Sequence, residues 1–450
     1  MDIMQRSCLT IALALAAASA SGQGFYVDEQ SALRLGNAFS GGAASGSDAS
    51  TAYYNPAAML LVGDEMAINL SAISVQSEFD GDATTGDGSI AIQGDDAEAD
   101  NFDLLPTLYY VQQVRDGLAA GVYINAPYAT GTDFGSDSVS RYQVSESNIT
   151  GIDLGLALGF KATKSLDLGV SMILQYLGAK QVVAINTPAL CLGQLDPATC
   201  SSLGVDPALL GSSTLDGRFE MEGDNTDVGF SVGSVYHLSE QARLGLHYRS
   251  RITHELTGSA KVSFPDGATT LVNIAGLESV TTAGSAQIST PEVLNLSYFQ
   301  RHGAWSWQAD LSWSKWSRYK ELAIQSRNST VAALTAEPQV YDWNESYRFA
   351  AGVDYQLSPQ LTLRSGFAYD QSPIDDDNVT IDFGFADYRA LSVGLSYAIN
   401  DQLTVDAGFQ HTLQQQRDID QNNLQSAGAR LNGEVTTDVN SAAVGVRWSL

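Results

Sequence analysis

The main feature of this sequence is a strict alternation of apolar residues with small or polar ones. In the stretch from Ile152 to Phe160, every second residue is apolar, and the residues between them are Asp, Gly or Ala. The same pattern returns over 166–176, 228–238, 244–248, 305–313, 391–399, 403–409 and 442–450. Because successive side chains of a β-strand point to opposite faces, each stretch predicts a strand with one apolar face.

The connections between these strands are of two alternating kinds. Tight turns fall at 115–117, 162–165, 239–241, 302–303, 358–360 and 400–401. Long polar connections lie near 80–103, 130–148, 186–217, 265–282, 326–338, 372–382 and 419–432. These connections imply an antiparallel up-and-down meander of about fourteen strands. With apolar residues outward and small or polar residues inward, this all-β pattern predicts a transmembrane β-barrel.

One stretch, from Gly24 to Val62, does not alternate and is rich in Gly, Ala and Ser. Within it, Asn55 is placed to cap a helix that begins with Pro56 and Ala57, because Asn can accept from the free amides of a first turn. The stretch is either an arm that lies against the barrel or a plug inside it. A lumen of this size is too wide for side chains alone to fill, so we predict a plug, or hatch.

Residues 1–20 have the charged start, apolar core and small-residue cleavage site of a secretory signal. We therefore expect the hatch to span 21–63 and the barrel to span 64–450. The mature chain keeps only two cysteines, Cys191 and Cys200. In an oxidising compartment this spacing predicts one local disulfide, with two free thiols as the alternative.

Composition excludes some functions. The 450-residue chain has a formal net charge of −28 and lacks the Lys and Arg clusters that nucleic-acid phosphates require. The five His are scattered, so we predict no metal site and no other cofactor. Segment 78–103 is acidic and has no Lys or Arg. It predicts a solvated outer loop, with a divalent-cation site as the alternative.

One motif could indicate an enzyme. The run from Gly229 through Ser231 to Gly233 matches the GxSxG pattern of hydrolases. It lies inside an alternating strand, without the turn and helix that a nucleophile elbow needs, so we predict no enzyme. The enzyme class that competes with this prediction is an outer-membrane phospholipase. Among proteins without catalysis, a diffusion porin and a surface adhesin also fit a barrel.

The third predicted strand, 118–128, contains residues that favour an opening in the wall. Pro127 cannot donate a hydrogen bond to a neighbouring strand, Asn125 lies beside it, and Gly121 leaves room next to the backbone. In a closed barrel, a local loss of pairing opens the wall sideways. The alternative is that Pro127 simply ends the strand.

The outer loop 186–217 is unusually apolar. Among Gly, Ser and Pro it carries Leu190, Leu192, Leu195, Leu203, Leu209 and Leu210. Exposed apolar clusters of this kind often mark interaction sites. The loop is either a docking groove for a hydrophobic ligand or a segment that packs on its neighbours.

Several motifs resemble those of the FadL family of outer-membrane long-chain fatty-acid transporters. They are the hatch sequence GFYVDEQSALRLGNAFSGGAA with its later Asn55-Pro56-Ala57, and the stretches 248–250, 311–317, 346–350 and 366–373. The resemblance covers nearly the whole mature chain. It implies passive uptake of long-chain fatty acids, or of other hydrophobic small molecules such as toluene-type hydrocarbons, with lateral release into the outer-membrane lipid. It also implies that Phe25 lies where the N-terminus meets the ligand. We expect a monomer in the bacterial outer membrane.

Overall fold

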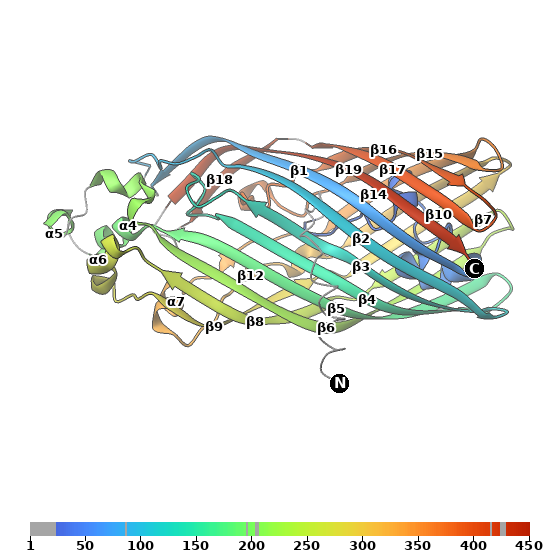
Figure 1. Cartoon of the computed structure of the whole chain (residues 1–450), viewed down its shortest axis with the longest axis horizontal. Coiled ribbons are helices and arrows are strands. Elements are labelled where there is room, and N and C mark those ends of the chain that lie inside the picture. The colour runs from blue at the N-terminus through green and yellow to red at the C-terminus, as the bar shows by residue number, and fades with distance from the viewer. Residues whose placement is uncertain (1–23, 86–87, 195–196, 203–206, 415, 424–428) are drawn as a thin grey trace.

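The computed structural model describes residues 24–85, 88–194, 197–202, 207–414, 416–423 and 429–450. The predicted signal sequence therefore lies outside the described residues. The described chain forms a closed antiparallel barrel, seen from its side in Figure 1.

Fourteen strand positions make up the barrel wall, and three of them are each built from two consecutive strands. The positions are β1 (Glu65–Thr85), β2 (Glu98–Arg115), β3 (Leu118–Asp133), β4 (Glu146–Lys161), β5 (Leu166–Ile185), β6 (Gly217–His237), β7 (Ala242–Arg249) with β8 (Ile252–Ser263), β9 (Val280–Thr290) with β10 (Val293–His302), β11 (Trp305–Ser314), β14 (Ser346–Gln356), β15 (Leu361–Asp370), β16 (Tyr388–Ala398), β17 (Leu403–Gln414) with β18 (Arg417–Asn423), and β19 (Ala429–Ser449). Strand β1 pairs with both β2 and β19 and so closes the barrel. A separate hairpin joins β12 (Glu321–Leu322) to β13 (Gln339–Val340).

The exposure of the side chains confirms the predicted two-faced strands. On β4, Leu156 is 51% exposed on the outer surface, whereas Asp153 is fully buried in the interior. Such an outer surface suits lipid, and this confirms the predicted membrane barrel. Within the described parts of the chain, no helix is both long enough and apolar enough to span a bilayer.

Short turns lie at one end of the barrel and long loops at the other (Figure 1). By the usual arrangement of such barrels, the long loops are extracellular. Their helical turns are α4 (Thr187–Gln194), α5 (Pro197–Ser202), η2 (Pro207–Gly211), η3 (Ser213–Leu215), η4 (Asp266–Ala268), α6 (Thr269–Ile274), η5 (Trp316–Arg318), α7 (Ser329–Leu334) and η6 (Asp376–Asn378). The predicted disulfide between Cys191 and Cys200 joins α4 to α5.

Residues 24–62, called the hatch below, lie inside the barrel. They form α2 (Ala32–Leu35), α3 (Thr51–Tyr54) and η1 (Pro56–Leu61). Arg34 holds the hatch together from its centre, because its buried guanidinium donates hydrogen bonds to Ser45, Ser50 and Thr51. The prediction of a plug in the lumen is thus confirmed.

Asn55 fixes the hatch to the wall. Its Oδ1 atom accepts from the Ala57 amide and caps η1, as the sequence predicts. Its Nδ2 atom donates to the Ala43 carbonyl at 2.7 Å and to the Ser234 carbonyl of β6 at 3.1 Å. A Cβ atom on Gly233 would lie 1.9 Å from Oδ1 of Asn55. Packing therefore explains the second glycine of the GxSxG match, because any side chain at position 233 would overlap the hatch.

We predict that Gly233→Val dislodges the hatch, because valine would overlap the Asn55 amide. Purified protein in planar bilayers should then show ion conductance raised several-fold over wild type. Gly63→Ala is the matched control, since a Cβ at Gly63 meets no atom within 4 Å. Unchanged conductance in folded Gly233→Val protein would show that this contact does not hold the plug.

Candidate functional site

The barrel wall is incomplete at β3. The strand continues through Pro127 to Asp133, so this proline does not end it. Strand β3 pairs with β2 only from Leu118 to Ile124, and its register with β4 shifts between Asn125 and Tyr128. Beyond Ile124, no further β2–β3 pairing occurs among the described residues. The edge of β3 that faces β2 is open there.

The N-terminal tail of the hatch occupies this open edge. The Val27 amide donates to the Pro127 carbonyl at 2.9 Å, and the Ala129 amide donates to the Phe25 carbonyl at 2.9 Å. These two bonds form an antiparallel bridge between Tyr26 and Tyr128. The tail therefore replaces β2 as the partner of β3, in the manner of a peptide added to a sheet edge.

Side chains complete the closure of the gap. The Gln30 amide brackets Ala126, donating to its carbonyl at 2.9 Å and accepting from its N–H at 3.2 Å. Asn101 of β2 spans the gap and donates to the Gly131 carbonyl at 2.6 Å. Asn125 is buried at the irregularity itself. Gly121 lies in the paired part of β3, where a Cβ would lie 2.6 Å from Met59 of the hatch, so it makes room for the hatch.

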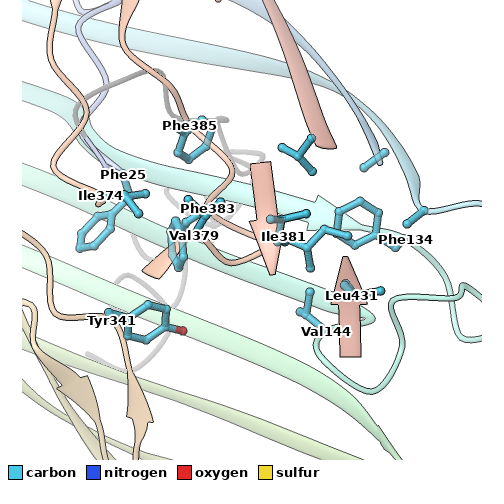
Figure 2. Packing of buried hydrophobic residues seen from close by; sticks show 14 of the residues in the cluster. Phe25, Phe134, Val144, Tyr341, Ile374, Val379, Ile381, Phe383, Phe385 and Leu431 are labelled. Carbon is cyan, nitrogen blue, oxygen red and sulfur yellow. The ribbon is translucent and has the colours of Figure 1, made fainter. Parts of the chain in front are cut away.

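Phe25 fills an aromatic cage in the lumen. Its ring is fully buried, and the ring centroids of Trp316 and Tyr319 lie 4.7 and 5.6 Å away. Trp343 and Phe383 complete the cage at 6.1 and 6.5 Å. Figure 2 shows Phe25 next to apolar side chains of the loop between β15 and β16. An apolar ligand of similar thickness would find its solvent-free site here.

Two small cavities, lined by apolar and polar residues, lie between this cage and the outer loops. A cavity of about 40 Å³ lies against Tyr319, Phe383, Leu322 and Ile324. A second cavity, of about 60 Å³, shares Leu322 and Ile324 and reaches Leu334 of α7. Leu334 in turn packs with the outer apolar clusters that include Leu190. Apolar side chains are thus present at each step from the loops to the cage.

The structure does not bring the predicted loop leucines next to Phe25. Leu190 is half-buried in α4, and Leu210 is buried in η2. Leu209 is half-buried beside it. All three lie at the extracellular end of the molecule, outside the aromatic cage. The side chains of Leu192, Leu195 and Leu203 lie outside the described residues.

Below the cage lies a polar chamber that sequence reasoning did not identify. A cavity of about 50 Å³ is lined by Tyr26, Tyr53, Arg249 and Arg348. Arg249 is 3% exposed and pairs with Asp153 at 2.7 Å. Its Nε and Nη2 atoms have no hydrogen-bond partner in the described part of the chain. Two buried guanidinium donors are therefore available to an oxygen atom of a ligand.

Arg348 is engaged differently. It pairs with Asp28 of the hatch at 3.1 Å and with Asp370 of β15 at 3.5 Å. It also donates to the Ala38 carbonyl at 2.8 Å. Arg348 thus fastens the hatch to the wall, whereas Arg249 carries the free donors. Sequence reasoning could have found Arg249 from its inward-facing position on β7 within the 248–250 motif.

Across the described ranges, no three His, Cys, Asp or Glu side chains are grouped so that they could hold an ion. This covers the described part of the acidic segment 78–103, where a cation site was the alternative to a solvated loop. What the site offers is an apolar cage, a polar chamber with two free donors, and an incomplete wall beside both.

Comparisons with known proteins agree with this geometry. Residues 13–450 match the model of a family described as outer membrane protein transport protein (OMPP1/FadL/TodX). The chain is 27% identical over 416 residues to a long-chain fatty acid transport protein of Escherichia coli, which covers 90% of each chain. It is 26% identical over 410 residues to a 47 kDa outer membrane protein of Pasteurella multocida, covering 90% of this chain and 91% of that one.

Solved structures show the same fold. A Pseudomonas aeruginosa FadL homologue superposes with a TM-score of 0.85 at 23% identity, covering 95% of this chain and 99% of the other. The Pseudomonas putida toluene transporter TodX superposes with a TM-score of 0.65 at 18% identity, covering 95% and 100%. Members of this family are outer-membrane transport channels rather than enzymes. The chain therefore belongs to the OMPP1/FadL/TodX family of outer-membrane transport proteins.

Proposed function

We propose that this protein is a monomeric channel for passive uptake of long-chain fatty acids or similar hydrophobic compounds, which leave through the wall at β3 into the outer-membrane lipid. The observation that carries the proposal is the open edge of β3, which is covered by the hatch tail and not by β2. The hatch tail is held on β3 by a few hydrogen bonds and can leave this edge, whereas a strand paired along its whole length cannot.

Energetics favour lateral release over release into the periplasm. Each CH₂ group returned to water costs about 0.8 kcal/mol, so a sixteen-carbon chain would face on the order of 10 kcal/mol. Passage through the wall keeps the chain in apolar surroundings throughout. The gap beside Pro127 lies next to the cage, because Tyr128 packs on Phe25 with ring centroids 6.0 Å apart.

The ligand would take the place of Phe25 in the cage. Phe25 already occupies that site, and its own carbonyl accepts from Ala129 on the open edge. Moving Phe25 out therefore removes one of the two backbone bonds that close the gap. Entry of the ligand and opening of the wall are thereby coupled through a single residue.

We predict that Phe25→Ala raises the affinity for palmitate about tenfold or more, because the ligand no longer competes with an aromatic side chain for the cage. Fluorescence displacement in detergent micelles would measure this. Phe102→Ala is the matched control, since Phe102 is exposed on the outer face of β2. A weaker affinity would mean that Phe25 forms part of the ligand's own site.

Arg249 is the proposed partner of a ligand head group. Arg249→Gln alone would leave the Asp153 carboxylate buried without its partner, so Arg249→Gln is combined with Asp153→Asn, and this double variant is compared with Asp153→Asn alone, which keeps the guanidinium. The double variant should bind palmitate about tenfold more weakly than the single variant, because a hydrogen bond to a charged group is lost. Binding of hexadecane should be equal in both. Equal palmitate binding would remove Arg249 from the head-group site.

An aromatic hydrocarbon is the second candidate ligand, because the cage consists of aromatic rings and edge-to-face packing suits a planar guest. Competition between palmitate and toluene for the purified channel distinguishes the two. Tighter binding of toluene would favour the second candidate, and the route through the gap would be the same.

Locking the gap tests lateral release. Asn101→Cys/Gly131→Cys is designed to join β2 to β3 at the place where the Asn101 side chain donates to the Gly131 carbonyl across the gap at 2.6 Å. Cells with this variant should lose uptake of labelled oleate while the disulfide is formed and regain it after mild reduction. The matched control is Asn101→Cys alone under both conditions. Uptake at the wild-type rate with the bridge formed would show that the substrate leaves by another path.

A further inference from the structure

The loop between β15 and β16, residues 371–387, folds inward and forms one side of the aromatic cage (Figure 2). Arg417 of β18 holds it there. Its guanidinium donates to the Ile374 carbonyl at 2.9 Å, to the Phe385 carbonyl at 3.1 Å and to Asp376 at 2.8 Å. The position of this loop against the cage is therefore fixed by several bonds to one side chain.

The loop carries an unexplained buried carboxyl group, Asp382. It is 6% exposed, and its Oδ2 atom has no hydrogen-bond partner in the described part of the chain. The side chains of Thr380 and Ser147 hydrogen-bond to the carboxyl group, so its remaining acceptor is the unpartnered Oδ2 atom. Burial raises the pKa of Asp382 above its usual value. A buried acceptor without a partner is costly, so a polar group that is absent from the protein alone would relieve it.

Asp382 lies beside the ligand path. Its neighbours Ser147 and Phe383 line the cavity of about 40 Å³ that adjoins the cage. Tyr319 and Tyr341, which also line this cavity, lie within electrostatic reach of the carboxyl. Most of the remaining lining is apolar. A ligand in this cavity would meet a polar region made of the two tyrosines with Ser147, Asn148, Lys180 and Gln181, and Asp382 adjoins it next to the lining residue Phe383.

This polar region offers an acceptor and no free cation. Lys180 is the one cationic side chain among the described residues that line the cavity, and both carboxylate oxygens of Glu146 accept from it at 2.7 Å. An ionised carboxylate placed here would face Asp382 without a compensating charge. A neutral hydroxyl group would instead donate to the unpartnered Oδ2 atom.

We propose that Asp382 is a binding subsite for a hydroxyl group, so that the channel binds long-chain compounds with a neutral O–H group more tightly than the same compounds without one. The inference rests on the proposed function and adds the substrate class. The apolar chain would lie along the cage and its hydroxyl would donate to Asp382. No bond is made or broken in this step.

The test compares probes that differ in the O–H donor. Affinities of the purified protein for 1-hexadecanol, its methyl ether and palmitate are measured at pH 7.5 by displacement. Wild type should bind the alcohol about tenfold more tightly than the ether, because only the alcohol can donate to the carboxyl. Palmitate, which is ionised and lacks the O–H donor, should gain nothing from Asp382.

Three variants separate the subsite from a general loss of folding. Asp382→Leu should bind the alcohol and the ether equally, whereas Asp382→Asn, which keeps one acceptor oxygen, should retain part of the preference. Asp377→Leu changes an exposed carboxyl on the same loop and should behave as wild type. A gel shift on heating shows that each barrel is folded.

Three outcomes overturn the inference. Equal binding of alcohol and ether by wild type, or an unchanged preference in Asp382→Leu, would remove Asp382 from the ligand site. Palmitate bound more tightly than the alcohol through Asp382 would assign the subsite to a different head group. If wild type bound none of the three probes, the proposed function itself would be wrong.

Discussion

Every backbone N–H and C=O group in the membrane region needs a hydrogen-bond partner, and the edge of β3 beyond Ile124 has no ladder partners on the β2 backbone. In this structure the hatch tail supplies the partners, through Phe25 and Val27. The position of the hatch in the lumen depends on this pairing of its tail with β3. The tail must reach the edge, so the hatch has to sit at one depth and in one orientation.

Two contacts between the hatch and the barrel wall set that depth. Asn55 contacts β6 at the bare Gly233, and Arg348 ties Asp28 to β15. With both anchors in place, the short tail from Phe25 to Val27 is held between the aromatic cage and the open edge. In the proposed mechanism, a hydrophobic molecule that enters the cage competes with Phe25 and thereby breaks the bond from Ala129 to the Phe25 carbonyl. Binding and opening thus need no large movement of the barrel.

Much of the fold could be predicted from the sequence. Side chains of a strand alternate between its two faces, so the lipid-facing and lumen-facing residues of the barrel alternate along the chain. The cap at Asn55 and the irregularity at Pro127 are also local features, and each follows from the chemistry of one residue. Local sequence does not decide whether Pro127 interrupts the pairing of β3 or ends the strand. The outcome depends on the hatch, which pairs with the strand beyond the proline.

The aromatic cage could not be predicted in the same way. Trp316, Tyr319, Trp343 and Phe383 come from two loops without any periodic pattern, and only the closed barrel brings them around Phe25. Apolar composition alone pointed to the outer leucines, which lie at the far end of the loops. Composition shows where apolar residues are concentrated, but their placement relative to the hatch depends on long-range packing.

The most direct test is hydrogen exchange at the amides of Val27 and Ala129, which both take part in the bridge between the tail and β3. Exchange would be followed in detergent with and without a saturating hydrophobic ligand, with the Leu35 amide, bonded to Ser31 within the hatch, as an internal reference. Ligand should speed exchange most at Ala129, whose bond to the Phe25 carbonyl is lost, and leave Leu35 unchanged. Exchange at Ala129 that is as slow with bound ligand as without it would contradict the coupling of the cage to the open edge.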